Sequence, residues 1–162
     1  MTHPHKEGMA TMQIHWKRSV LAGLAGTVIF DVLGLLLTGN WWDIPGLLGM
    51  KLGTGFVGGV LAHYANGVIL AIIYAGLAPS LWGPGWVRAL SYMTVQTLFG
   101  VWLFMMPLLD MGVAGMKVSA LMPVISLVRH WGYGLALAWL YPLSQRDPAS
   151  QTACGFPEAA KL

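Results

Sequence analysis

Long stretches of this chain carry almost no ionisable side chain, and this limits its fold more than any other feature. Residues 52–87 contain one ionisable group other than tyrosine, His63, and residues 89–109 contain none. A hydrocarbon layer about 30 Å thick is crossed by roughly 20 apolar helical residues. Only 9% of the 162 residues are charged, which is about a third of the usual fraction. The sequence therefore predicts an all-α, polytopic membrane protein and excludes a soluble domain.

The apolar segments predict four membrane-spanning helices that form a bundle. We expect these helices at residues 19–38, 55–76, 87–106 and 118–141. Pro107 and Pro142 follow the third and fourth segments, where a proline is expected to end a helix. The connection at residues 39–53 is rich in tryptophan and leucine, so we expect it to lie in the membrane interface.

The basic residues predict how the chain is oriented. If both termini and the middle loop lie on one side, that side receives six of the nine Lys and Arg residues: Lys6, Lys17, Arg18, Arg88, Arg146 and Lys161. Because cytoplasmic loops are enriched in these residues, we expect cytoplasmic tails at residues 1–15 and 143–162. The net charge of +3 then reflects orientation in the lipid bilayer, and no nucleic-acid partner is expected.

The second half of the chain repeats the first. Residues 63–74 align without a gap to residues 130–141, with His, Gly, Leu, Ala and Tyr identical. We interpret the pattern as a tandem duplication of a helical hairpin, with repeat one at 16–78 and repeat two at 86–142. Two spans per repeat place both copies in the membrane the same way round, so the pseudo-twofold axis stands along the membrane normal.

The duplication predicts a polar layer inside the membrane, because equivalent residues of the two repeats share a depth. His63 and His130 are expected at the same level, opposite one another. Asp31 reaches nearly the same layer, and Arg129 is next to it. Each histidine belongs to a row of small residues at helical spacing, with Gly67 or Gly134 one turn away, and such rows occur where membrane helices touch.

Two interpretations of the histidines remain open. In the first they are neutral and buried, and they form hydrogen bonds to each other, to Asp31, to Gln96 or to a backbone carbonyl, each worth roughly 0.6 to 2 kcal/mol. In the second, His63 and His130 are the axial ligands of a b-type haem, and Gly67 and Gly134 make room for the porphyrin. Zinc is less favoured, because Asp31 is the one obvious third ligand in this layer.

Asp31 and Arg129 each occur in only one repeat, which predicts that they meet as an ion pair between the first and fourth helices. In the alternative, Arg129 extends toward the outer surface while Asp31 is protonated or bonded to a histidine. A third interpretation makes Asp31, His63 and His130 a proton relay, since these residue types carry protons in membrane pumps.

The chain resembles a family of small, uncharacterised four-helix inner-membrane proteins of bacteria. The resemblance covers residues 16–142 and is carried by an Arg-led first span, a His-aromatic-x-x-Gly second span, and Arg-His-Trp-Gly-Tyr-Gly-Leu-Ala-Leu in the fourth. His63 with Gly67 and His130 with Gly134 are its most specific elements, and Arg129 departs from the small or polar residue expected there. The resemblance implies location and architecture, and no activity.

We therefore expect a non-enzymatic structural or accessory component of the bacterial inner membrane, either within a membrane protein complex or as a homo-oligomer. A bis-histidine haem protein for electron transfer is the first alternative, and a proton or small-solute conduit is the second. The sequence contains no nucleotide-binding loop and no hydrolase or zinc-protease motif, so an enzyme is not expected.

Overall fold

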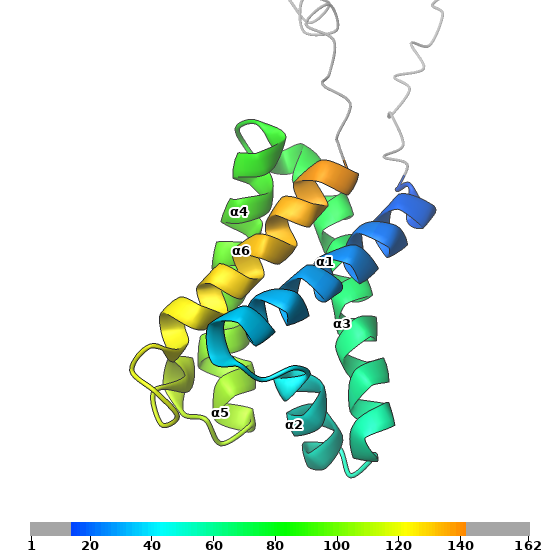
Figure 1. Cartoon of the computed structure of the whole chain (residues 1–162). Coiled ribbons are helices and arrows are strands. Elements are labelled where there is room, and N and C mark those ends of the chain that lie inside the picture. Colours follow the sequence, from blue (N-terminus) through cyan, green and yellow to red (C-terminus); the bar gives the residue numbers. More distant parts are fainter. Residues whose placement is uncertain (1–13, 142–162) are drawn as a thin grey trace, which may run out of the picture.

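The computed structural model describes residues 14–141, and the secondary structure of this part of the chain is entirely helical (Figure 1). Its elements are α1 (Trp16–Thr38), α2 (Asp43–Lys51), α3 (Gly55–Leu77), η1 (Ala78–Ser80), α4 (Gly85–Gln96), η2 (Thr97–Met105), α5 (Met106–Leu108), η3 (Val113–Gly115) and α6 (Met122–Leu140). The predicted tails lie outside the described residues, except for positions 14 and 15. The all-α prediction is confirmed.

Three helical segments are long and apolar enough to cross a membrane: Trp16–Thr38, Gly55–Ser80 and Gly85–Leu108. They agree with the first three predicted spans. The fourth predicted segment corresponds to α6, which starts at Met122 and not at residue 118. Pro123 explains the later start, because proline fits the first turn of a helix, where its missing N–H is not needed.

The third span is one continuous helix made of α4, η2 and α5, and its middle part η2 is a π-helix. The π-helix begins where the Thr97 hydroxyl donates to the Met93 carbonyl (2.7 Å), so the side chain shares an acceptor with the helix backbone. Short π-helical bulges occur frequently at functional sites. Four residues of this π-helix line the cavity described below: Gly100, Val101, Phe104 and Met105.

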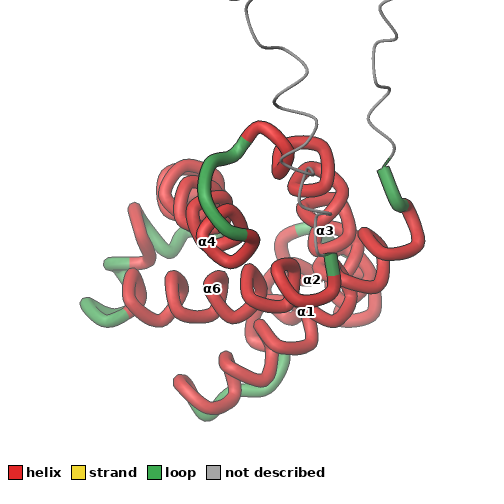
Figure 2. The backbone as a smooth tube through the Cα atoms, turned by 90° about the horizontal axis from the view of Figure 1, so that it is seen from above, coloured by secondary structure: helices red, strands yellow, loops and turns green. Residues whose placement is uncertain are grey.

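Helix α1 packs against both α3 and α6, and α6 also packs against α4. Seen from above, α3 and α4 lie on the same side of the α1 and α6 pair (Figure 2). They do not pack closely on one another. Instead they are linked by the Tyr92 hydroxyl, which donates to the Leu70 carbonyl (2.9 Å), and by the rings of Tyr74 and Tyr92, whose centroids are 5.5 Å apart.

The contact of α1 with α3 resembles the contact of α4 with α6, but the contacts between these two pairs of helices differ. The hydroxyls of Thr27 and Thr97 both donate to the carbonyl four residues earlier, at 2.8 and 2.7 Å. Gly67 lies against α1, just as Gly134 lies against α4. The α1 to α6 contact is close, whereas the corresponding α4 to α3 contact is not. A twofold axis would require these last two contacts to be equal. Among the described helices they are not.

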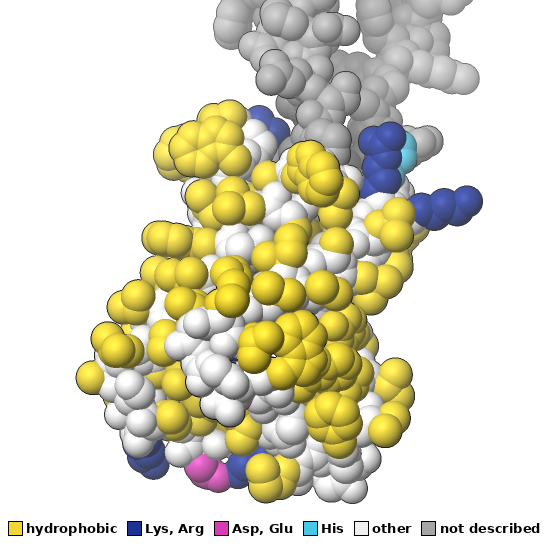
Figure 3. Space-filling view, viewed as in Figure 1, with side chains coloured by type: hydrophobic (Ala, Val, Ile, Leu, Met, Phe, Trp, Pro, Cys, Tyr) yellow, Lys and Arg dark blue, Asp and Glu magenta, His cyan; other side chains and the backbone are white. Residues whose placement is uncertain are grey.

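Apolar side chains cover the outer surface of the helices, as expected for a molecule surrounded by lipid. Large residues such as Leu36 (72% exposed) and Trp139 (80% exposed) point outward. On the face shown in Figure 3, Lys and Arg side chains gather at the two ends. One end holds the entry to α1 and the exit from α6, where the His15 N–H donates to the Tyr141 hydroxyl oxygen (3.4 Å).

The connection at residues 39–53, which we expected to lie in the membrane interface, contains a helix. Its second half forms the helix α2, which packs against α3. Trp42, just before α2, has a left-handed backbone with φ of 65°, and the Asp43 carboxylate accepts from the Ile44 N–H (2.8 Å). Pro45 is buried in the first turn, where proline is tolerated. Helix α2 brings Asp43 up to the bundle.

Candidate functional site

Asp31 and His63 form a buried pair between α1 and α3. Nε2 of His63 lies 3.0 Å from Oδ1 of Asp31, and the Tyr64 hydroxyl donates to Oδ2 (3.2 Å). Asp31 is 1% exposed. With Asp31 ionised, its carboxylate can only accept, and Nε2 of His63 is then the nitrogen that carries the hydrogen. Asp31 was one of the partners expected for a neutral, buried histidine, and it is the observed partner of His63.

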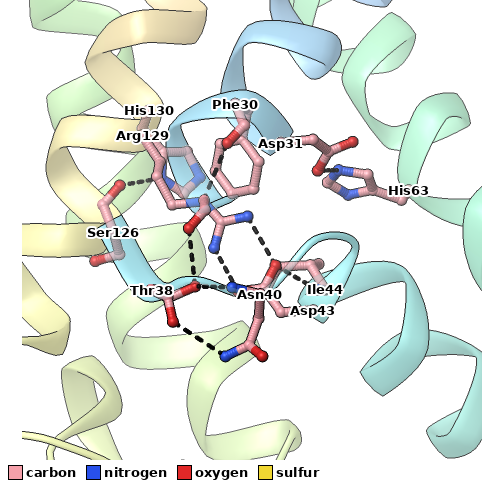
Figure 4. Close-up of polar contacts among 11 residues, drawn as sticks. Phe30, Asp31, Thr38, Asn40, Asp43, Ile44, His63, Ser126, Arg129 and His130 are labelled. Carbon is pink, nitrogen blue, oxygen red and sulfur yellow. Dashed lines mark hydrogen bonds and ion pairs between the residues drawn. The ribbon is translucent and has the colours of Figure 1, made fainter. Parts of the chain in front are cut away.

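Arg129 of α6 forms a bidentate ion pair with Asp43 at the start of α2 (Figure 4). Its two terminal nitrogens donate to the carboxylate oxygens at 2.6 and 2.9 Å, and Nε donates to the Phe30 carbonyl (3.2 Å). The guanidinium carbon also lies 4.1 Å from the centre of the Phe30 ring. Arg129 is 3% exposed, so this charge is buried and compensated.

The predicted ion pair between Asp31 and Arg129 is absent, and each charge has a different partner. The Arg129 side chain passes Gly34 of α1, where a Cβ would come within 2.6 Å of the guanidinium carbon. This route takes the guanidinium to α2, while Asp31 faces α3. The prediction failed because the position of α2, which provides Asp43, does not follow from the apolar segments.

His130 is bonded within its own helix. Its Nδ1 lies 2.6 Å from the Ser126 carbonyl oxygen, which can only accept, so Nδ1 carries the hydrogen. In a neutral ring Nε2 is then unprotonated and free to accept. No direct bond joins His130 to Asp31 or to His63 among the described residues, although Asp31 and His63 are bonded to each other.

The Phe30 ring lies between the two imidazoles (Figure 4). Ring centroids are 5.5 Å apart for Phe30 and His63 and 4.9 Å apart for Phe30 and His130. A porphyrin ligated from both faces would need the space that this ring fills. The histidines do lie near one another on both sides of one residue, but in this arrangement they do not fit a bis-histidine haem, nor do they continue a proton relay from Asp31.

A cavity of about 460 Å³ lies between the helices. Both histidines, Gln96, Gly67 and Arg129 line it, together with many apolar side chains. Gly134 packs beside it against Met93 and the Ala89 carbonyl. Most of the predicted polar layer therefore meets around one cavity. No group of three or more metal-ligating acids, histidines or cysteines occurs within residues 14–141.

Sequence reasoning missed three residues that shape this site: Phe30, Asp43 and Asn66. Asp43 carried a signal, because it has a counterpart in the repeat, Asp110. Asp110 pairs with Lys51, and both acids thus tie an outer connection to another element. Asn66 also carried a signal in the sequence, since it is a carboxamide within an apolar span. Phe30 carried none, because a phenylalanine in a membrane helix is ordinary.

These features define an integral membrane protein with buried, paired polar groups around a cavity between its helices. Comparison with models of known protein families, with curated proteins and with solved structures finds no match for this chain.

Proposed function

We propose that this chain is a non-enzymatic structural or accessory component of the bacterial inner membrane. One observation carries this proposal: the two ionisable groups in the middle of the helices, Arg129 and Asp31, have partners inside the chain. Asp43 neutralises Arg129, and Asp31 accepts from His63 and Tyr64. Ionisable groups inside a membrane call for a functional hypothesis by default, with their partners named. Here their partners lie on other helices, so holding the bundle together accounts for them.

The proposal includes α6 as the fourth span of a bundle. Its 19 residues extend about 28 Å at 1.5 Å per residue, which is close to the hydrocarbon thickness. Its polar residues Arg129 and His130 are buried, while Val124, Leu135 and Trp139 are exposed. Average hydropathy understates how well such a helix suits lipid, because its polar groups face the interior.

Tandem duplication of a hairpin and cytoplasmic termini belong to the same proposal. The matched bonds of Thr27 and Thr97 and the matched contacts of Gly67 and Gly134 support the duplication. The common end of the bundle at which His15 and Tyr141 meet supports an even number of crossings. The bias of Lys and Arg toward that side supports its assignment to the cytoplasm.

A bis-histidine haem protein is the second candidate, and one observation favours it. Nδ1 of His130 is held by a backbone carbonyl, which is how proteins commonly orient a metal-ligating histidine, and Nε2 is left available for iron. His63 would have to release Asp31, and Phe30 would have to leave its place between the rings.

An absorption spectrum of the full chain purified in detergent separates the two candidates. The proposal predicts a colourless protein whose variants His63→Ala and His130→Ala melt at lower temperature. Trp139→Leu, an exposed change on the same helix as His130, serves as the control and should leave the melting temperature unchanged. A haem band that disappears in both histidine variants would overturn the proposal and establish the alternative.

A further inference from the structure

The cavity between the helices is enclosed on most sides and open on one. Helices α1 and α6 close one side, α2 contributes Ile44, Leu47 and Leu48, and α3 and the α4–η2 helix face each other across it. Two residues line the cavity and are also exposed: Asn66 of α3 and Phe104 of η2 (64%). Because α3 and η2 do not pack together, we place the mouth of the cavity between these two residues.

This mouth faces lipid and not water. The neighbouring exposed side chains on the two helices are large and apolar: Leu61, Ile69, Val95, Phe99 and Leu103. A molecule that enters between α3 and η2 must therefore come from the hydrocarbon layer. The volume of about 460 Å³ falls within the roughly 300 to 1,000 Å³ usual for small-molecule sites.

Two carboxamides lie on opposite walls of the cavity at the middle of the membrane. Asn66 is the central residue of α3 (23 residues), and Gln96 lies at the centre of the Gly85–Leu108 helix (24 residues). Oε1 of Gln96 is buried and has no hydrogen-bond partner among residues 14–141. This oxygen can only accept, so the ligand that satisfies it must carry a hydrogen-bond donor.

The remaining polar groups of the cavity make it suitable for a neutral ligand. The charge of Arg129 is already neutralised by its bidentate pair with Asp43, so the guanidinium offers no uncompensated charge to a carboxylate or phosphate. Asp31 is likewise engaged by His63. Phospholipid headgroups lie at the membrane surface and not at the depth of Asn66 and Gln96. A fatty acid or phospholipid headgroup therefore does not match the site.

The apolar lining favours a flat conjugated ring. Five methionines line the cavity: Met93, Met105, Met106, Met111 and Met122. Methionine adapts its shape to a ligand, and its sulfur makes favourable contacts with aromatic rings. Phe30 and Phe104 add aromatic surface. The π-helix η2 forms part of the same wall, with Gly100 beside the Gln96 carboxamide. Two opposed carboxamides can bind oxygens on both sides of such a ring.

We propose that this cavity binds an isoprenoid quinone, with the ring held between Asn66 and Gln96 and the tail passing between α3 and η2 into the bilayer. A carboxamide contains both a donor and an acceptor, so it can bind quinone carbonyls and quinol hydroxyls alike. The site goes beyond the proposed structural role and does not depend on it.

The test is a titration of the full chain, in lipid nanodiscs, with decylubiquinone in its reduced form, decylubiquinol, whose hydroxyl can donate to Oε1 of Gln96. We expect saturable binding at one quinol per chain, counted by native mass spectrometry. Asn66→Leu and Gln96→Leu should each raise the dissociation constant about tenfold, since each removes one hydrogen bond to the ring. Asn40→Leu, at an exposed asparagine outside the cavity, should leave it unchanged. Dioleoylglycerol, a neutral lipid without a ring, should not compete.

Three results would overturn the proposal: no saturable binding by the wild type, equal binding by the Asn66 and Gln96 variants, or displacement of the quinol by dioleoylglycerol. A dimer that dissociates in Asn66→Leu would assign this asparagine to an interface between copies and would also overturn it. Melting curves of all variants show that they fold. The absorption spectrum that tests the structural role is a separate measurement, so the two proposals fail independently.

Discussion

Asp43, the first residue of α2, binds both terminal nitrogens of Arg129 from α6, at 2.6 and 2.9 Å. The two residues are 86 positions apart in the sequence, and the pair joins the connection after α1 to the last helix. The Arg129 side chain is 4% exposed and that of Asp43 is 25% exposed. The pair therefore ties α2 to α6 through a buried charge that could not remain there alone.

Breaking this pair should lower the free energy of unfolding, by an amount that depends on which of the two residues is replaced. Asp43→Asn leaves an uncompensated buried guanidinium and should lower the free energy of unfolding by about 3 kcal/mol. Arg129→Met should cost less, because the remaining carboxylate is partly exposed and the new side chain is apolar. The double variant should recover most of the stability lost in Asp43→Asn. Denaturant titration in mixed micelles, followed by circular dichroism, measures these changes.

The exposed ion pair of Lys51 with Asp110 provides the control. Asp110→Asn removes an equivalent charge from an exposed pair, and such pairs contribute little to stability. If Asp43→Asn and Asp110→Asn prove equally stable, the Arg129 pair does not tie α2 to α6.

Two glycines of α3 should respond to alanine in opposite directions. A Cβ at Gly67 would collide with the Thr27 hydroxyl across the α1 to α3 contact, whereas a Cβ at Gly76 would meet open space. Gly67→Ala should therefore lower the free energy of unfolding by roughly 1 to 3 kcal/mol. Gly76→Ala should leave it unchanged or raise it by up to about 1 kcal/mol, because alanine favours a helix.

The melting temperatures of Gly67→Ala and Gly76→Ala in the same detergent test this prediction. Since both positions lie on one helix, a general effect of alanine on α3 would move both in the same direction, and that result would contradict the close contact at Gly67.

Asp110 should give the stability a small dependence on acid pH. Its hydrogen bond to Lys51 lowers the pKa of the Asp110 carboxyl below the usual 3.8, and the charges of Lys51 and Lys117 act in the same direction. A lowered pKa in the folded state stabilises it above the unfolded pKa, and this contribution disappears as pH falls through the folded pKa. The effect should also weaken at high salt, because the pair is exposed.

Asp110→Asn tests this effect without disturbing the backbone. Asp110 has a left-handed backbone with φ of 60°, which asparagine tolerates as well as aspartate does. The difference in unfolding free energy between wild type and variant should be largest at neutral pH and low salt, and it should disappear as the pH falls through the lowered pKa of the folded state. A difference that persists unchanged at acid pH would mean that the charge of Asp110 plays no part.

The single cysteine, Cys154, makes the orientation directly measurable. With cytoplasmic termini, a maleimide that cannot cross membranes should label Cys154 only after the cells are opened. A chain with Cys154→Ser and Lys117→Cys should behave in the opposite way, since Lys117 lies at the other end of the bundle in the connection before α6. Labelling of Cys154 in intact cells would reverse the proposed orientation.

The helical class and the position of three spans could be predicted from the sequence. Hydrocarbon leaves a backbone no partner other than itself, so a long uncharged apolar segment must be helical, and its length is set by the thickness of the membrane. The small residues around Gly67 also predicted a helix contact, because only they allow backbones to approach so closely.

The partners of the charges were decided by the tertiary structure. Arg129 was expected to meet Asp31 because both are charges in one layer, and the actual partner, Asp43, depends on the helix α2 and on the gap left by Gly34. A long side chain can reach several partners, and the crossing of α1 with α6 selects among them. The histidines likewise required the tertiary structure, because nothing in the sequence places the Phe30 ring between them.

The cavity also came only from the tertiary structure. Asn66 and Gln96 are ordinary polar interruptions of two apolar segments in the sequence. They face one space because α3 and η2 stay apart, while the corresponding helices α1 and α6 pack closely. The sequence thus determined which segments enter the membrane, since burial of apolar surface is a local property of each segment. The folded chain determined which polar groups meet, since that depends on helix crossings and on contacts distant in sequence.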